Sequence, residues 1–361
     1  MRKKQKEIKV SPDVLIALRE TSGYSLEEIA KKLNTSKEKV SLVEEGRAAF
    51  TLTQIKKLAE IYNRPLAAFF SSSIPELPKI VDYRVNREKR LTSEVYLAQR
   101  RARYLSEKIK ELSGKRSKIP SFSERLSADE LAREFKKTLN IEPIKHQKAD
   151  KILAHYKEVL EDDLSIIILE YPLKADDVRA FSIYSELAVI VLNEEDKPSI
   201  KLFSLFHEIC HLLKKTAGIC SLEIEKQNQD IESYCNLFAA EFLVPADDLR
   251  IEVERLKGIN DETINQLTDT YGVSKQVMMI RLLWLNYIEK EKYEQFKKKI
   301  DEELKRKAFG RKNWDKIFLN RVGHLSLQEI KNSYDKGLIT FYEASSIIDL
   351  KTKYAEKLIV E

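Results

Sequence analysis

Cysteine, glycine and proline are all scarce in this chain of 361 residues. The three cysteines lie at positions 210, 220 and 235 without a Cys-x-x-Cys pair, so we expect no disulfide framework and a reducing, cytoplasmic location. Nine glycines and nine prolines favour helices over a β-sandwich or barrel. No apolar run approaches the roughly 18 residues of a membrane span, and no apolar segment follows the basic start "MRKKQKEIKV". We therefore predict neither membrane insertion nor secretion.

Charged residues, by contrast, make up 34% of the chain, and 43% of its residues are hydrophobic. This composition is typical of a globular protein, and the length predicts several modules. The basic residues are concentrated near the start, where residues 1–72 contain 14 Lys/Arg against 9 Asp/Glu and residues 84–125 contain 13 against 5. Such an excess suits a nucleic-acid partner, although a basic helix face is more often simply solvated.

Two short helices separated by a polar turn are predicted within the first 50 residues. Ser25 begins the first, and Glu28 completes a capping box with it. Thr35 or Ser36 begins the second helix, which Gly46 ends. The pair predicts a helix-turn-helix, whose second helix enters the major groove of double-stranded DNA. Another kind of small helical bundle would show the same periodicity.

The stretch "LIALRETSGYSLEEIAKKLNTSKEKVSLVEEGR", followed by "LTQIKKLAEIYNRPLAAFF", resembles the Xre-type helix-turn-helix family. The resemblance implies DNA binding through a reading face and a phosphate contact. The residues it places on the reading face are Ser36, Lys37, Glu38 and Ser41, and the residue it assigns to a phosphate is Arg47. Because Glu38, Glu44 and Glu45 would repel phosphates, we expect modest affinity or binding as a homodimer.

Between residues 150 and 200 the apolar pattern changes from helical to strand-like. The segments "DDLSIIILEYP", "DVRAFSIYSE" and "LAVIVLNEE" predict three short strands of a small antiparallel sheet. Helical patterns lie before and after them. We therefore predict a mostly helical α+β protein with an all-α bundle at its N-terminus.

The segment "KLFSLFHEICHLLKK" carries the pattern H-E-x-x-H on a predicted helix. His207 and His211, four residues apart, lie on one side of a helix and can both bind one metal ion. Glu208 is rotated by about 100° from His207, so it suits a general base acting on a water at the metal. The alternative is an amphipathic core helix that contains histidine. Its apolar neighbours would bury both rings, which is costly without a metal or hydrogen bonds.

A third ligand is expected on the downstream helix "IESYCNLFAAEFLVP". Glu232 is our choice, with Asn236 one turn later as the hydrogen-bond partner of a ligand histidine. Glu241 and Glu225 are the rivals. Tyr184 and Tyr234 are candidates for stabilising an oxyanion, although both suit ordinary packing. The remaining feature is a pair of cysteines, Cys210 and Cys235, close to the expected metal.

These motifs resemble the ImmA/IrrE family of zinc-dependent metallopeptidases, which is often fused to an Xre-type domain. "LAVIVLN" with "LFSLFHEICHLL", and then "ESYCNLFAAEFLVP", match the family's strand, H-E-x-x-H helix and glutamate helix. Ile209, Cys210 and the Tyr-Cys before Asn236 depart from the usual pattern. The resemblance implies a zincin-like α+β domain that binds Zn²⁺. Its implied ligands are His207, His211 and Glu232, and its implied catalytic base is Glu208.

The expected organisation follows from both resemblances. It comprises a helix-turn-helix domain at 1–72, a linker and long basic helix at 73–130, a zinc metallopeptidase-like domain at 131–288 and a helical C-terminal domain at 289–361. We expect a transcriptional regulator that hydrolyses a peptide bond in a protein, such as an Xre-type repressor or a copy of this chain. The alternatives are a DNA-binding repressor or antitoxin-like protein with a structural, sensory or inactive metal site, and a helical interaction protein without a metal.

Overall fold

The computed structural model describes residues 7–71, 91–174, 178–215, 227–256, 258–303, 313–350 and 352–360. These residues form two compact units. The first contains residues 7–71, 91–101 and 172–174, and the second contains residues 102–171 and those from 178 onward. Most of the expected linker "SSSIPELPKIVDYR" lies outside the described residues.

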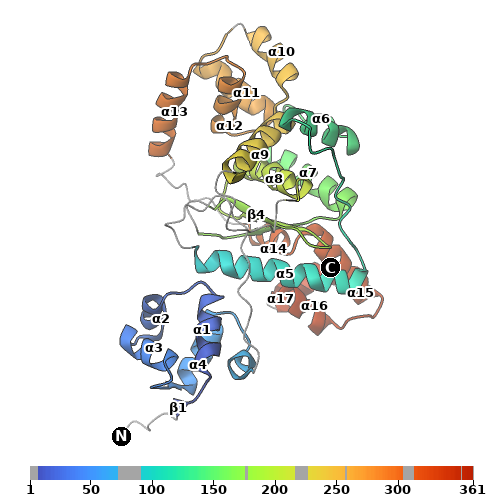
Figure 1. Cartoon of the computed structure of the whole chain (residues 1–361). Coiled ribbons are helices and arrows are strands. Elements are labelled where there is room, and N and C mark those ends of the chain that lie inside the picture. Colours follow the sequence, from blue (N-terminus) through green and yellow to red (C-terminus); the bar gives the residue numbers. More distant parts are fainter. Residues whose placement is uncertain are drawn as a thin grey trace. The chain divides into compact units, whose positions relative to one another are not determined.

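The first unit is a small helical bundle with a two-stranded antiparallel sheet (Figure 1). Along the chain its elements are β1 (Glu7–Ile8), α1 (Pro12–Glu20), α2 (Leu26–Leu33), α3 (Lys37–Glu44), β2 (Phe50–Thr51), α4 (Leu52–Ile61), the 3-10 helix η1 (Leu66–Phe70) and the beginning of α5 (Ser93–Ser113). The expected capping box of Ser25 and Glu28 begins α2. Ser36 begins α3, where its hydroxyl accepts from the Lys39 amide. The helix-turn-helix is therefore α2 followed by α3.

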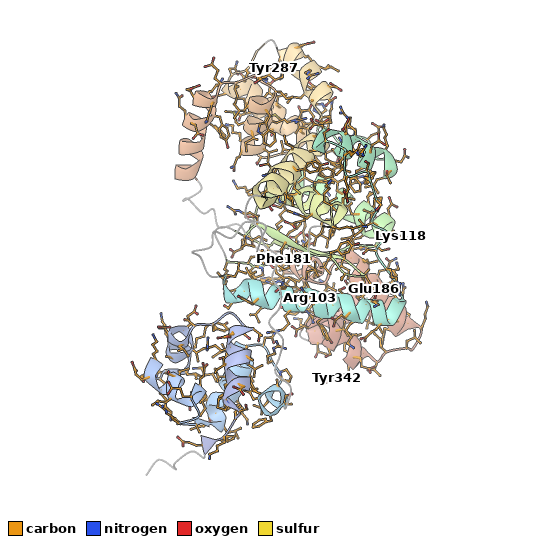
Figure 2. All side chains as sticks on the ribbon, viewed as in Figure 1. Arg103, Lys118, Phe181, Glu186, Tyr287 and Tyr342 are labelled. Atoms are coloured by element: carbon orange, nitrogen blue, oxygen red, sulfur yellow. The ribbon has the colours of Figure 1, made fainter. Side chains whose placement is uncertain are left out.

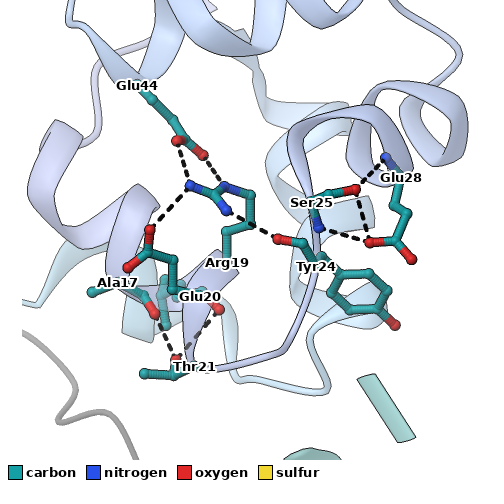
Figure 3. Close-up of polar contacts among 9 residues, drawn as sticks. Ala17, Arg19, Glu20, Thr21, Tyr24, Ser25, Glu28 and Glu44 are labelled. Carbon is teal, nitrogen blue, oxygen red and sulfur yellow. Dashed lines mark hydrogen bonds and ion pairs between the residues drawn. The ribbon is translucent and has the colours of Figure 1, made fainter. Parts of the chain in front are cut away.

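Arg19 holds the end of α3 in place (Figure 3). Its guanidinium donates two hydrogen bonds to the Glu44 carboxylate, at 2.7 and 3.0 Å, and one to the Tyr24 carbonyl at 3.0 Å. A paired, bidentate contact of this kind fixes orientation as well as distance. Glu44, which we expected to repel phosphates, therefore has its charge balanced within the domain.

The second unit contains a three-stranded sheet surrounded by helices. Its elements are the end of α5, then α6 (Ala128–Thr138), α7 (Ala149–Leu164), β3 (Ile167–Tyr171), β4 (Ala180–Ile183), β5 (Val189–Asn193), α8 (Pro198–Leu213), α9 (Gln227–Leu243), α10 (Ala246–Leu256), α11 (Asp261–Tyr271), α12 (Lys275–Trp284), α13 (Lys290–Glu303), α14 (Trp314–Val322), α15 (His324–Asp335), α16 (Phe341–Ile348) and α17 (Thr352–Ile359). The predicted class, mostly helical α+β, is confirmed. None of the described helices is both long and apolar enough to cross a membrane.

The sheet differs from the prediction in one strand pair. Its order is β3-β5-β4, in which β4 and β5 are antiparallel as predicted, whereas β3 and β5 are parallel. The antiparallel prediction is wrong for this pair. The three strands alternate in direction along the chain, and the last of them, β5, lies between the other two, so it runs parallel to β3. All five residues of β5 are buried, as is typical of a central strand covered on both faces. An apolar run alone does not indicate the direction of its neighbours.

Helices cover the sheet within this unit (Figure 1). The helices α7 and α8 pack on it and on each other, and α9 packs along α8. The C-terminal helices α14 and α15 pack against β3. The core between α8, α9 and the sheet is apolar and includes stacked rings of Phe206 and Phe242, with centroids 3.9 Å apart. This core determines where the polar residues of α8 and α9 meet.

Candidate metal centre

The histidines of H-E-x-x-H lie in the most enclosed helix of the second unit. Pro198 at the first turn begins α8, where its missing N–H is not needed. From Leu202 to Leu213 the side chains are buried with one exception, because the sheet, α7 and α9 surround the helix. His207 is 0% exposed and His211 is 4% exposed. Burial of both imidazoles requires partners for their nitrogens.

Those partners come from α9. Glu232 Oε2 lies 3.2 Å from His207 Nε2, and Glu232 Oε1 lies 3.1 Å from His211 Nε2. The two Nε2 atoms are 3.1 Å apart. Four donors around a tetrahedral zinc at about 2.0–2.1 Å are about 3.3 Å from one another. The donor spacing and the donor types therefore fit one divalent metal ion.

Asn236 orients one of these ligands. Its Oδ1 lies 2.9 Å from His207 Nδ1, which suits an Nδ1–H that donates to the amide oxygen. With a metal bound, that tautomer would leave the lone pair of Nε2 for the metal, between Glu232 and His211. This is the arrangement that metal-binding histidines commonly use.

The electrostatics of the three donors also suit a cation. Burial alone would raise the pKa of Glu232, but hydrogen bonds from His207 and His211 outweigh it and hold that pKa far below its usual range. Burial likewise lowers the pKa of His211, but hydrogen bonds to the Cys235 thiol and the Glu232 carboxylate dominate and raise it to about 10. In the metal-free protein the protonated His211 ring thus balances the negative charge of the Glu232 carboxylate, at the place where a divalent cation would be held.

Glu208, the predicted base, is 5% exposed and follows His207 on α8. Ser182 Oγ, on strand β4, donates a hydrogen bond to Glu208 Oε2 at 2.8 Å. Sequence reasoning missed Ser182. The available signal was a hydroxyl within the apolar strand "AFSI", where all four residues are buried.

The rivals of Glu232 do not join the cluster. Glu241 is 3% exposed and forms an ion pair with Arg281 of α12, while its Oε2 also accepts from the Ala246 amide. Glu225 lies outside the described residues. Among the described residues, the group of His, Cys, Asp and Glu side chains suited to a metal is His207, His211 and Glu232.

The other residues singled out near the centre have different surroundings. The Tyr234 hydroxyl donates to the Leu126 carbonyl at 2.8 Å, so it serves packing in this structure. Tyr184, just after β4, is exposed. Cys210 and Cys235 are both buried free thiols, and burial raises the pKa of Cys235 well above its usual value. A buried thiol of this kind is a poor nucleophile.

The residues predicted to contact DNA lie on α3, directly before it and just after it, and several have acidic partners. Lys37 forms an ion pair with Glu27. Ser41 Oγ donates to Glu45 Oε1 at 2.9 Å, and Arg47 lies 3.1 Å from Glu45 Oε2.

Ser36, Glu38 and Leu42 complete the exposed surface of this helix. Hydrogen bonds from its own backbone amide and from Ser36 lower the pKa of the Glu38 carboxyl. Leu42 is 39% exposed and was missed by sequence reasoning, because an apolar residue in an amphipathic helix is first expected to face the core.

Comparison with known proteins gives two family matches. Residues 161–283 match the model of the IrrE N-terminal-like domain of the peptidase M78 family, and residues 13–68 match the model of a helix-turn-helix domain. The chain therefore contains a helix-turn-helix domain and an IrrE-like domain, as the motifs predicted. The first match supports a metallopeptidase-like domain, and the second supports DNA binding.

Among solved structures, a Mycobacterium tuberculosis transcriptional regulator matches with 14% sequence identity and a TM-score of 0.32. The match covers 52% of this chain and 51% of that chain, so this chain spans about half the length of that protein. Comparison with curated proteins gives no match.

Proposed function

We propose that this protein is a DNA-binding regulator whose IrrE-like domain binds zinc and hydrolyses a peptide bond in a repressor-type protein. The observation that carries the proposal is the convergence of His207, His211 and Glu232. The two histidine Nε2 atoms are 3.1 Å apart, and each lies 3.1–3.2 Å from one of the two Glu232 carboxylate oxygens. Two buried histidines and a carboxylate are a donor set typical of catalytic zinc. A cytoplasmic location and a homodimer remain predictions.

Each residue around the centre has a proposed role. Zinc held there would supply Lewis-acid activation of water and of the substrate carbonyl. Asn236 would hold the His207 ring in the tautomer that ligation requires. Glu208 would accept a proton from the attacking water and return it to the leaving amine. The side chains that exclude bulk solvent are those of the surrounding core.

Strand β4 is proposed to hold the substrate in an extended form. It is an edge strand of the sheet, paired with β5 on one side. It also packs against α8, the helix that carries the histidines. A substrate strand added to the other side of β4 would hydrogen-bond through its backbone, as in other cases of strand addition. This arrangement would accept a flexible protein segment of varied sequence.

The second candidate function is a DNA-binding repressor or antitoxin-like protein whose metal site is structural, sensory or inactive. The observation that favours it is burial, since His207 and Glu208 are at most 5% exposed. A catalytic centre needs access for a peptide, whereas a structural metal site is closed. Metal content alone does not separate the two functions, and cleavage does.

The test begins with metal analysis of the purified protein and of His207→Ala. We expect one equivalent of zinc in the former and none in the latter. Glu208→Gln should keep zinc, because it removes no ligand, and should lose cleavage. The matched control is Glu329→Gln, which alters another largely buried carboxylate, on α15, away from the donors.

The substrate is sought by comparing the proteomes of cells that express wild type, Glu208→Gln or Glu329→Gln. A repressor-type protein should disappear with wild type and with the control, and should persist with Glu208→Gln. Zinc without any protein lost would support the second candidate. Absence of stoichiometric zinc would reject both.

A further inference from the structure

We propose that Ser182 is the positioning residue of the proposed general base. Its hydroxyl donates to Glu208 Oε2 at 2.8 Å and holds the carboxylate in one orientation. Among the described residues, Ser182 is the hydrogen-bond donor to the Glu208 carboxylate. Oε1 is thereby the oxygen left to accept a proton. The inference rests on the proposed function and assigns a role to a residue outside H-E-x-x-H.

The position of Ser182 in the sheet supports this role. Ser182 is opposite Ile190 of β5, and its strand neighbours, Phe181 and Ile183, point to the other face because side chains alternate along a strand. Figure 2 labels Phe181 on this strand. Ser182 thus shares its face with Ala180, toward the core that α8 completes. It is 6% exposed, so the hydroxyl would be costly here without a partner.

The chemistry of the bond suits orientation. A hydroxyl that donates to a carboxylate makes a charge-assisted hydrogen bond, which is shorter and stronger than a neutral one. Glu208 has three rotatable side-chain bonds and follows a residue that binds the metal, so α8 alone does not determine the direction of its carboxylate. A donor on the adjacent strand supplies that direction. Because β4 is also the strand proposed to hold the substrate, one element would position both the base and the scissile bond.

The experiment compares Ser182→Ala, which removes the donor, with Ser182→Thr, which keeps the hydroxyl on a side chain suited to a strand. Ser182→Cys preserves the volume with a weak donor and serves if the alanine variant does not fold. Ser333→Ala is the matched control. That serine is 4% exposed and donates one hydrogen bond of 2.8 Å to the Glu329 carbonyl, within α15.

The first readout needs neither metal nor substrate. In a double-mutant cycle on chelated protein, Ser182→Ala should lower the urea midpoint when Glu208 is present and should lower it less in the Glu208→Ala background. Equal shifts in both backgrounds would overturn the contact. Ser333→Ala should give the same shift in both.

The second readout separates positioning from a purely structural role. Ser182→Ala should keep one equivalent of zinc. When cobalt replaces the zinc, the visible absorption spectrum of Ser182→Ala should move toward that of Glu208→Gln. Ser182→Thr should restore the wild-type spectrum. On the repressor identified by proteome comparison, kcat should fall about 10- to 100-fold with KM unchanged. Loss of zinc, or a cobalt spectrum and kcat equal to wild type, would overturn the proposal. If wild type cleaves nothing but the coupling and the cobalt shift are present, the peptidase function fails and the positioning role stands.

Discussion

Replacement of Asn236 by alanine should weaken zinc binding, whereas replacement by aspartate should not. Asn236 Oδ1 accepts from His207 Nδ1 at 2.9 Å, and His207 is fully buried, so the Nδ1–H has no access to replacement solvent. Asn236→Ala leaves that N–H without its acceptor and the ring without its orientation. Loss of such a partner typically costs 10- to 100-fold in metal affinity, which is about 1.4–2.8 kcal/mol.

Asn236→Asp should instead keep or raise the affinity. A carboxylate accepts the same N–H more strongly than an amide does and makes the ligand more basic. Zinc dissociation constants would be measured by competition with a chromophoric chelator at constant pH. Asn193→Ala is the control, because it removes a largely buried amide that accepts from the Glu195 amide, away from the donors. Equal affinities for wild type and Asn236→Ala, or weaker binding by Asp than by Ala, would refute this reasoning.

Three further predictions concern other parts of the chain. Burial raises the pKa of Glu161 to about 7, so its contribution to stability is fully present below about pH 4.5 and is lost as the pH rises toward 7. Glu161→Gln should remove this dependence and stabilise the protein by up to about 3 kcal/mol at pH 8, measured by urea unfolding at pH 5 and pH 8. Glu45→Gln should strengthen DNA binding severalfold and steepen its salt dependence, because it removes the carboxylate that contacts Ser41 and Arg47. DNA affinity would be measured by fluorescence anisotropy at two salt concentrations, and unchanged affinities would contradict this prediction. Leu42→Ala should remove discrimination between thymine and uracil in a selected operator, because an exposed leucine on α3 can contact the thymine methyl group.

The local parts of both sites were predictable because they depend on spacing within one element. The capping box of Ser25 and Glu28 satisfies amides three residues apart, whatever surrounds the helix. The side-by-side placement of His207 and His211 follows from the four-residue spacing on α8 in the same way. The presence of both modules followed from such motifs as well.

The choice of the third donor was less certain from sequence. Glu232 and Glu241 lie on the same helix, and each has suitable chemistry. Only the packing of α12 shows that Arg281 pairs with Glu241, which leaves Glu232 facing the histidines. The arginine that pairs with Glu241 lies forty positions away along the chain, so the sequence around Glu241 does not indicate it.

By itself the sequence determined the two modules, the helices with their caps, and the spacing of His207, Glu208 and His211, because these depend on neighbours within one or two turns. Tertiary structure alone decided the parallel pairing of β3 with β5 and the contact between Ser182 and Glu208. It also decided the approach of α9 that brings Glu232 to the histidines. These contacts depend on how separate apolar surfaces pack together. Because the hydrophobic effect is not directional, a local sequence pattern does not specify which surfaces will meet.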